Sequence, residues 1–179
     1  YVQELRESPE REMRSLLNAL NGGFIAPSPG GDAVRNPNTL PTGRNLFGIN
    51  AEATPGVRAW DEGKALAKST LDRYYRKHGE YPRKVSYTFW AGEFIETEGA
   101  TLAQALYMLG VAPVRDGMNR VTDLRLIPSA ELGRPRIDVV VQTSGQLRDV
   151  AASRLELLTK AVKMVAQSKN DTCGNYVSE

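Results

Sequence analysis

Strand-like and helix-like segments alternate along the second half of the chain, and this alternation constrains the fold more than any other feature. The segment "KVSYTFW", residues 84–90, is β-branched and aromatic, as strands are, and "TLAQALYML", residues 101–109, is typical of a helix. The nearly continuous apolar run "RIDVVVQ", residues 136–142, predicts a strand buried on both faces, and a long helix follows over residues 146–167. Together these segments predict an α/β fold with a mostly parallel sheet flanked by helices.

Other segments complete the expected elements. Short strands are predicted over residues 111–115 and 121–127, and a helix over residues 58–78. His78 ends that helix, where the helix dipole favours it. The first helix is expected to begin at Ser8-Pro9, because a hydroxyl cap followed by proline is a common helix start. Its apolar stripe comprises Met13, Leu16, Leu17 and Leu20.

A long segment rich in glycine and proline separates the first helix from the second. Residues 22–57 contain seven glycines and five prolines. Loops longer than about 12–15 residues are usually either functional or disordered. This one carries apolar residues that a disordered linker lacks, so it is expected to be ordered and packed; they are Phe24, Ile25, Val34, Leu40, Leu46, Phe47 and Ile49. The expected organisation is therefore a helix and loop over residues 1–57 and an α/β domain over residues 58–179.

Composition excludes several classes of function. The net charge is only +2 and the basic residues are scattered, which argues against nucleic-acid binding. Cys173, in a tail expected to fray, is the one cysteine, which fits a reducing compartment, and we expect a cytoplasmic location. His78 is the one histidine, so no histidine-rich metal centre is expected. No apolar run approaches the roughly 20 residues of a membrane helix. The chain begins without Met and ends "GNYVSE", and we expect it to be a fragment of a longer one.

Ligands of open α/β sheets bind beyond the carboxyl ends of the strands, and two such ends carry candidate residues. One is the turn from Trp90 to Glu93, and the other is Ser144-Gly145, followed by Arg148 and Asp149. Serine in such a turn is more often an ordinary helix cap, and tryptophan at a strand end is more often a core or rim aromatic than a ligand platform. Arg148 and Asp149, in a first helical turn, are of a kind that is usually solvated or held in a local ion pair. Glu93 and Asp149 are weak candidates for proton transfer.

The loop "RNPNTLPTGRN", residues 35–45, carries specific polar residues without helical or strand periodicity. Arg35 and Arg44 offer rigid donor forks suited to carboxylates or phosphates, and Asn36 and Asn45 can brace turns. The alternative is that these side chains only staple the loop to its own domain. A phosphate-binding P-loop and a dinucleotide fingerprint are both absent from the sequence, which argues against a nucleotide binder.

Several segments resemble one known family. "GGFIAPSPGGDAVRNPNTLPTGRN", "GEYPRKVSYTFW", "ETEGATLAQALYMLGVAPV", "ELGRPRIDVVVQTSGQLRD" and "LLTKAVKMVA" are similar, in this order, to blocks of the large chelatase subunit. That family comprises the N subunit of cobaltochelatase and the H subunit of magnesium chelatase. The resemblance covers nearly the whole chain, and "RNPxxLPTGRN" and "LGRPRIDV" are not generic patterns.

The resemblance implies a function. Such subunits bind a tetrapyrrole for metal insertion, and partner subunits, an AAA+ ATPase and a metal-site adaptor, hydrolyse ATP to drive it. "NLFGINAEATP" followed by "RAWDEGKALA" favours the cobalt branch, which inserts cobalt into hydrogenobyrinic acid a,c-diamide for cobalamin. One alternative is insertion of magnesium into protoporphyrin IX, and another is a non-catalytic scaffold segment that docks the ATPase subunits.

The resemblance also implies roles for the candidate residues. Arg35 and Arg44 would grip side arms of the substrate, while Asn36 and Asn45 hold the loop. The remaining substrate-binding candidates lie at or just after the ends of the two strands; they are Trp90, Ser144, Gly145 and Arg148. The residues that handle the metal are expected mainly outside this chain, which alone is expected to be inactive.

Overall fold

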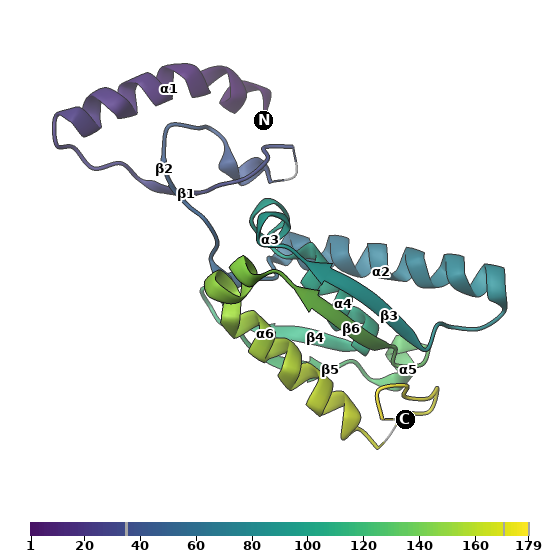
Figure 1. Cartoon of the computed structure of the whole chain (residues 1–179). Helices are drawn as coiled ribbons and strands as arrows, with labels where there is room; N and C mark the ends of the chain where they lie inside the picture. The colour runs from purple at the N-terminus through teal and green to yellow at the C-terminus, as the bar shows by residue number, and fades with distance from the viewer. Residues whose placement is uncertain (35, 170, 179) are drawn as a thin grey trace.

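The computed structural model describes residues 1–34, 36–169 and 171–178 of the chain (Figure 1). Helix α1 and two very short strands lie at one end, and an α/β body follows. In chain order the elements are α1 (Val2–Leu20), β1 (Pro27–Pro29), the 3-10 turn η1 (Pro37–Thr39), β2 (Asn45–Phe47), the 3-10 turn η2 (Ala51–Ala53), α2 (Val57–His78), β3 (Lys84–Phe89), α3 (Ala91–Thr97), α4 (Ala100–Leu109), β4 (Val111–Arg115), β5 (Val121–Leu126), α5 (Ser129–Leu132), β6 (Asp138–Thr143) and α6 (Gly145–Ala166).

The expected parallel pairing is formed by β3 and β6, which run side by side from Lys84↔Asp138 to Phe89↔Thr143. The α/β class with parallel strands is confirmed. The described strands nevertheless form three separate pairs instead of one sheet, and the β4–β5 pair is antiparallel. The connection between β4 and β5, residues 116–120, is too short for a parallel crossover, which needs about a dozen residues or more.

Strand β6 is covered on one face, so the expectation of burial on both faces was wrong. Val140 is 48% exposed, and Ser86 and Thr88 of β3 are also exposed. Ser86 lies directly opposite Val140 in the parallel register, so these side chains share one open face. Helix α4 contacts both strands, and Val139 and Val141 are partly buried against the core. Within the described residues this strand pair therefore alternates between buried and open positions.

The hydrophobic core surrounds α4, whose residues are buried on nearly every side. Helices α3 and α6 and the β4–β5 pair share one buried cluster with it; its largest members are Phe89, Phe94, Leu102, Leu106, Leu109, Val111, Leu147 and Val165. Helix α2 packs on α4 at Gly63, where a Cβ atom would lie 2.6 Å from the carbonyl oxygen of Ala100. The close approach of the two backbones explains a glycine in the middle of a helix.

Helix α6 spans the expected residues but is bent. Ala151 has non-helical backbone angles, with φ −144° and ψ 36°. Ala151, Leu158 and Val165 are buried in the core, whereas Val150, just before the bend, is 43% exposed.

Two buried arginines close the C-terminal end of α4. Arg134 and Arg136 donate hydrogen bonds to backbone carbonyl oxygens at this end and across the hairpin; the acceptors belong to Tyr107, Met108, Leu109, Gly110 and Ile127. The last carbonyls of a helix lack partners within the helix and carry partial negative charge, so cationic donors suit them. The segment "GRPR" thus has a structural role that its sequence alone does not reveal.

The described residues 171–178, beyond α6, are packed against the body, which contradicts the expectation of a frayed tail. Arg136 forms an ion pair with Asp171, and the two side chains are only 3% and 6% exposed. Asn175 is also buried and donates to the carbonyl oxygen of Val165 at 2.8 Å. This stretch is held by buried polar contacts, which a search for apolar periodicity misses. Cys173 is exposed and is a free thiol.

Helix α1 begins at Val2 and not at Ser8, so the expected start was wrong. Pro9 lies inside the helix, and Ser8 donates from its hydroxyl to the carbonyl oxygen of Glu4 at 2.9 Å. Side-chain contacts at four-residue spacing support the helix on both sides of the proline; they are Gln3 with Glu7, Glu7 with Arg11, and Glu10 with Arg14. They offset the hydrogen bond that proline cannot donate.

The apolar stripe of α1 is open to solvent. Met13, Leu16, Leu17 and Leu20 are each more than half exposed. The loop after α1 is ordered, but most of its expected apolar anchors are also exposed; Phe24, Val34 and Leu46 are 84%, 75% and 68% exposed. Leu40 is buried, and Ile49 packs on the core. Within the described residues, no helix is long and apolar enough to cross a membrane.

Candidate functional site

The two strand ends that the sequence singled out meet at one edge. Parallel pairing places Phe89 opposite Thr143, and the backbone N–H of Ser144 donates to the carbonyl oxygen of Phe89 at 3.0 Å. Trp90 follows β3 at this edge and is 60% exposed. We call this region the strand-end rim, namely Trp90 with Ser144 and Gly145. Its geometry matches the place where ligands of open α/β sheets bind.

Ser144 acts as the N-cap of α6, because its hydroxyl oxygen accepts from the backbone N–H of Leu147 at 3.2 Å. Gly145 is the first helical residue. Arg148 and Asp149 are exposed on the first turns of the helix. The ordinary capping role of Ser144 is therefore present, and it leaves Arg148 and Asp149 accessible from solvent.

Glu93 is turned toward the beginning of α4 and away from solvent. Its Oε1 accepts from the Thr97 hydroxyl at 2.7 Å and from the backbone N–H of Thr101 at 3.2 Å. Its Oε2 is buried and has no hydrogen-bond partner among the described residues. A carboxylate beside the first turn of a helix is electrostatically favourable, so Glu93 has a structural role at this position.

Asn36 ties the loop to the body. Its side chain is buried, donates to Oε1 of Glu98 at 3.0 Å and accepts from the backbone N–H of Asn38 at 3.2 Å. The second contact is the turn-bracing bond expected of an Asn in such a loop. Asn45 is exposed in β2, where its backbone N–H donates to Ala26.

Arg44 directs its fork onto its own loop. It donates to the carbonyl oxygens of Asn38, Leu40 and Pro41 at 2.7, 3.0 and 3.1 Å. Carbonyls in a segment without regular structure need such partners. This geometry favours the stapling alternative for Arg44. Arg35 lies outside the described residues.

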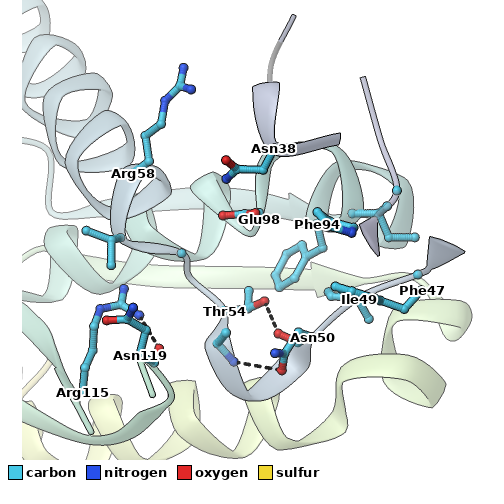
Figure 2. A pocket seen from close by; sticks show the side chains of 17 residues that line it. Asn38, Phe47, Ile49, Asn50, Thr54, Arg58, Phe94, Glu98, Arg115 and Asn119 are labelled. Atoms are coloured by element: carbon cyan, nitrogen blue, oxygen red, sulfur yellow. Dashed lines mark hydrogen bonds between the residues drawn. The ribbon is translucent and has the colours of Figure 1, made fainter. Parts of the chain in front are cut away.

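A cavity of about 350 Å³ lies where the loop meets α3 (Figure 2). We call it the α3 cavity. Its lining residues come from β1, η1, β2, the η2 region, the start of α2, α3 with its C-terminal cap, the end of β4 and the β4–β5 connection. The side chains used below are those of Phe47, Ile49, Phe94, Asn38, Arg58, Glu98, Arg115 and Asn119. The Phe94 ring lies in the middle of the labelled group, with Phe47 and Ile49 on one side of it and Arg115 and Asn119 on the other. The cavity thus combines an apolar side with a polar one.

Arg115 is the partly buried cation of this cavity. It donates to the carbonyl oxygens of Pro55 and Asn119. Burial lowers the pKa of its guanidinium, while the nearby Asp61 and Glu98 carboxylates act in the opposite direction. Arg58 is more exposed and pairs with Glu62 at 3.1 Å. Both arginines therefore already have carboxylates close by.

A buried arginine of α6 fixes the η2 side of the cavity. Arg154 donates to the carbonyl oxygen of Thr54 at 3.0 Å and pairs with Glu52 at 3.0 Å. Glu52 also accepts from the hydroxyl of Ser153 at 2.9 Å. Burial lowers the pKa of Arg154, and Glu52 opposes that shift. These contacts of Arg154 and Ser153 tie the segment between β2 and α2 to α6, the helix that starts at the strand-end rim.

The sequence model of a protein family described as CobN/Magnesium Chelatase matches residues 1–179, the entire chain. The chain belongs to this family. It is 41% identical over 169 residues to magnesium-chelatase subunit ChlH of rice and 37% identical over 169 residues to aerobic cobaltochelatase subunit CobN of a Sinorhizobium species. These alignments cover 94% and 93% of the chain but only 12% and 13% of the relatives.

A solved member of the family has the same fold. The catalytic subunit of cobaltochelatase from Mycobacterium tuberculosis superposes with a TM-score of 0.83 at 40% identity, over 98% of this chain and 15% of that one. The chain therefore spans only 12–15% of the length of the compared proteins. Cobalt and magnesium members are similar to it to nearly the same degree, so identity does not choose between the two branches.

The residues of the α3 cavity are the ones that sequence reasoning missed. Arg115, Asn119 and Glu98 come from separate segments and form no motif in the chain. The sign that points to Glu98 is its place before Gly99, at the junction of two helical segments. Among the described residues, no three His, Cys, Asp or Glu side chains gather closely enough to hold a metal ion. The chemistry that the described site offers is polar and apolar recognition.

Proposed function

We propose that this chain forms part of the tetrapyrrole-binding surface of the large subunit of an ATP-dependent cobaltochelatase. The substrate would be the corrinoid precursor hydrogenobyrinic acid a,c-diamide, into which cobalt is inserted during cobalamin synthesis. The observation that carries the proposal is the α3 cavity, in a chain that matches the chelatase family throughout. Small-molecule sites are concave and largely apolar, with a few converging polar groups.

The size of the cavity suggests how much of the substrate it takes. About 350 Å³ lies at the lower end of the range of roughly 300–1,000 Å³ for ligand sites. A macrocycle would therefore place one edge and one or two side arms here, over Phe47 and Ile49. Trp90, on the strand-end rim, offers a second apolar surface, and Arg148 and Asn45 are exposed candidates for further arms.

Metal insertion also requires ligands for the metal and groups that accept the two pyrrole protons. We assign these mainly to parts of the subunit outside this chain, because Glu93 faces α4 and the described residues offer no group of three carboxylate, His or Cys side chains around the exposed Asp149. ATP would be hydrolysed by an AAA+ partner subunit that acts with a metal-site adaptor. The chain on its own would be inactive.

Two other functions have specific support. The first is magnesium insertion into protoporphyrin IX, because the chain is as similar to the magnesium-chelatase subunit of rice, at 41% identity, as it is to the cobalt members. A scaffold that docks the ATPase subunits is favoured by the open apolar stripe of α1, residues 13–20. In the scaffold case, changes in that stripe would alter partner binding and leave pigment affinity unchanged.

The test is an equilibrium titration of the full-length subunit with hydrogenobyrinic acid a,c-diamide and, separately, protoporphyrin IX, followed by quenching of tryptophan fluorescence. Phe47→Ala removes an aromatic ring from the cavity, and we expect it to weaken binding of the preferred pigment about tenfold. Leu46→Ala is the matched control, because Leu46 is a neighbour in β2, 68% exposed and outside the cavity lining.

Each result has a distinct meaning. Weaker binding in Phe47→Ala alone, with the corrinoid preferred, supports the proposal. Preference for protoporphyrin IX would assign the chain to the magnesium branch. Equal affinities of the wild type and both variants would remove the α3 cavity from the binding surface.

A further inference from the structure

We propose that the α3 cavity is a subsite for a carboxamide side arm, and that Glu98 selects the amide against a free carboxylate. This inference rests on the proposed function, since it names the chemical group that the same cavity takes. It differs from a generic anion site, which two arginines in one cavity would otherwise suggest. The argument depends on the charges around the cavity, on its donors and acceptors, and on how Glu98 is held.

The charges around the cavity nearly cancel. Arg58 is paired with Glu62 on the exposed side, and its side chain extends away from the other labelled residues in Figure 2. Arg115 is the cation that remains, and it faces two carboxylates, Glu98 and Asp61. A substrate carboxylate would therefore meet negative charge as well as positive charge, and like charges at short range are unfavourable.

The polar groups suit a ligand that both donates and accepts. Arg115 is a donor, and the amide of Asn119 lies beside it; both line one side of the cavity. Glu98 is an acceptor and lies with Asn38 on the other side. A primary amide has a carbonyl acceptor and an NH₂ donor, so it matches both sides at once. A carboxylate only accepts, so it would offer no donor to Glu98 and would place a second negative charge beside it.

Glu98 is fixed in place by three features. It is the residue after α3 and has a positive φ of 53°. Its Oε1 accepts from Asn36, and its backbone carbonyl accepts from the N–H of Gly56 at 2.9 Å. A Cβ atom at Gly56 would lie 2.3 Å from Oε2 of Glu98, so a larger residue there would displace the carboxylate from this position. Selection requires an acceptor held in one position, and these contacts provide it.

The test uses the full-length subunit and two forms of one corrinoid, the a,c-diamide and the same macrocycle with both amides hydrolysed to carboxylates. Glu98→Gln keeps the shape and the acceptor for Asn36, but it presents an NH₂ donor in place of a charged oxygen. We expect affinity for the diamide to fall about tenfold, because the NH₂ group of the ligand loses a charged acceptor and meets another donor. We expect affinity for the diacid to rise, because its carboxylate gains a donor and no longer faces a negative charge. The opposite signs are the signature of selection.

Glu62→Gln is the matched control. It makes the same chemical change and the same change in net charge at the partner of Arg58, outside the α3 cavity. We expect the ratio of the two affinities to stay within about twofold of the wild-type ratio. Thermal unfolding of each variant reports any loss of structure.

The outcomes separate this inference from the function on which it rests. If Glu98→Gln changes both affinities in the same direction and by the same factor, the amide subsite is refuted, while tetrapyrrole binding stands. If the wild-type subunit binds neither form, the proposed function fails, and the subsite fails with it. A reversed preference confined to Glu98→Gln supports both.

Discussion

Arg136 is expected to be one of the strongest single contributors to the stability of the chain. Its side chain is 3% exposed, pairs with Asp171 and donates to the carbonyl oxygens of Leu109, Gly110 and Ile127. The substitution Arg136→Met keeps much of the buried stem but removes every donor. It deprives a buried carboxylate of its cation and three backbone carbonyl oxygens of a charged donor.

The magnitude follows from those lost partners. Removing one member of a buried ion pair costs about 3–5 kcal/mol, and each buried acceptor left unpaired adds about 1–3 kcal/mol. Because the contacts share one guanidinium and the site can relax, the terms overlap, and we expect a total of about 4–6 kcal/mol. Domains are stable by only about 5–15 kcal/mol, so Arg136→Met should leave the chain close to unfolding.

The assay is urea unfolding followed by far-ultraviolet circular dichroism and by fluorescence. Lys84→Met is the control, because Lys84 also pairs with an aspartate, Asp138, at 2.9 Å, but is 61% exposed. Loss of that pair should cost less than about 1 kcal/mol. Adding Asp171→Asn to Arg136→Met should restore part of the loss, since it removes the unpaired charge. A cost below about 1.5 kcal/mol for Arg136→Met, or an equal cost for Lys84→Met, would refute the reasoning.

Three further predictions concern other parts of the chain. Arg44→Ala should destabilise the loop by about 2 kcal/mol, because three carbonyl oxygens lose a charged donor; amide hydrogen exchange over residues 38–44 should accelerate, whereas Arg148→Ala should leave it unchanged. Gly63→Ala should cost about 1–3 kcal/mol, since the new methyl group would press on Ala100 and Ala103, and the melting temperature measures it. Burial raises the pKa of Tyr87 to about 12, so its contribution is complete below pH 10 and is lost as pH rises toward 12; stability should fall by about 2 kcal/mol more in the wild type than in Tyr87→Phe over that window, as measured by denaturant unfolding.

Elements with a strong local pattern were predictable from the sequence. The long helices α2 and α6, the strand β3 and the cap at Ser144 lie within one or two residues of their predicted positions. Patterns that depend on neighbours were not predictable. Pro9 lies within a helix supported by side-chain pairs, and Val140 lies on the open face of the β3–β6 pair. The antiparallel β4–β5 pair follows from a connection that is too short for a parallel crossover.

The candidate site was predictable only in part, for a similar reason. Trp90 and Ser144 lie at the same edge because β3 and β6 pair in parallel, and the sequence predicts that pairing from its strand-like segments. The α3 cavity follows from contacts between segments far apart in the chain, such as Asn36 with Glu98 and Glu52 with Arg154. The spacing of residues along the sequence cannot show which distant segments will contact each other.

The most distinctive residues of the chain serve its backbone. The sequence made Arg44 a candidate for ligand binding, yet Arg44 donates to carbonyl oxygens of its own loop, and Arg134 does the same at the end of α4. Segments without helix or strand leave carbonyl groups unpaired, and an arginine can satisfy several of them at once. A loop such as residues 36–45 therefore needs specific side chains simply to hold one shape. Recognition then falls to residues that this scaffold positions, and Glu98 is the clearest case, because the loop residue Asn36 holds the carboxylate that faces the cavity.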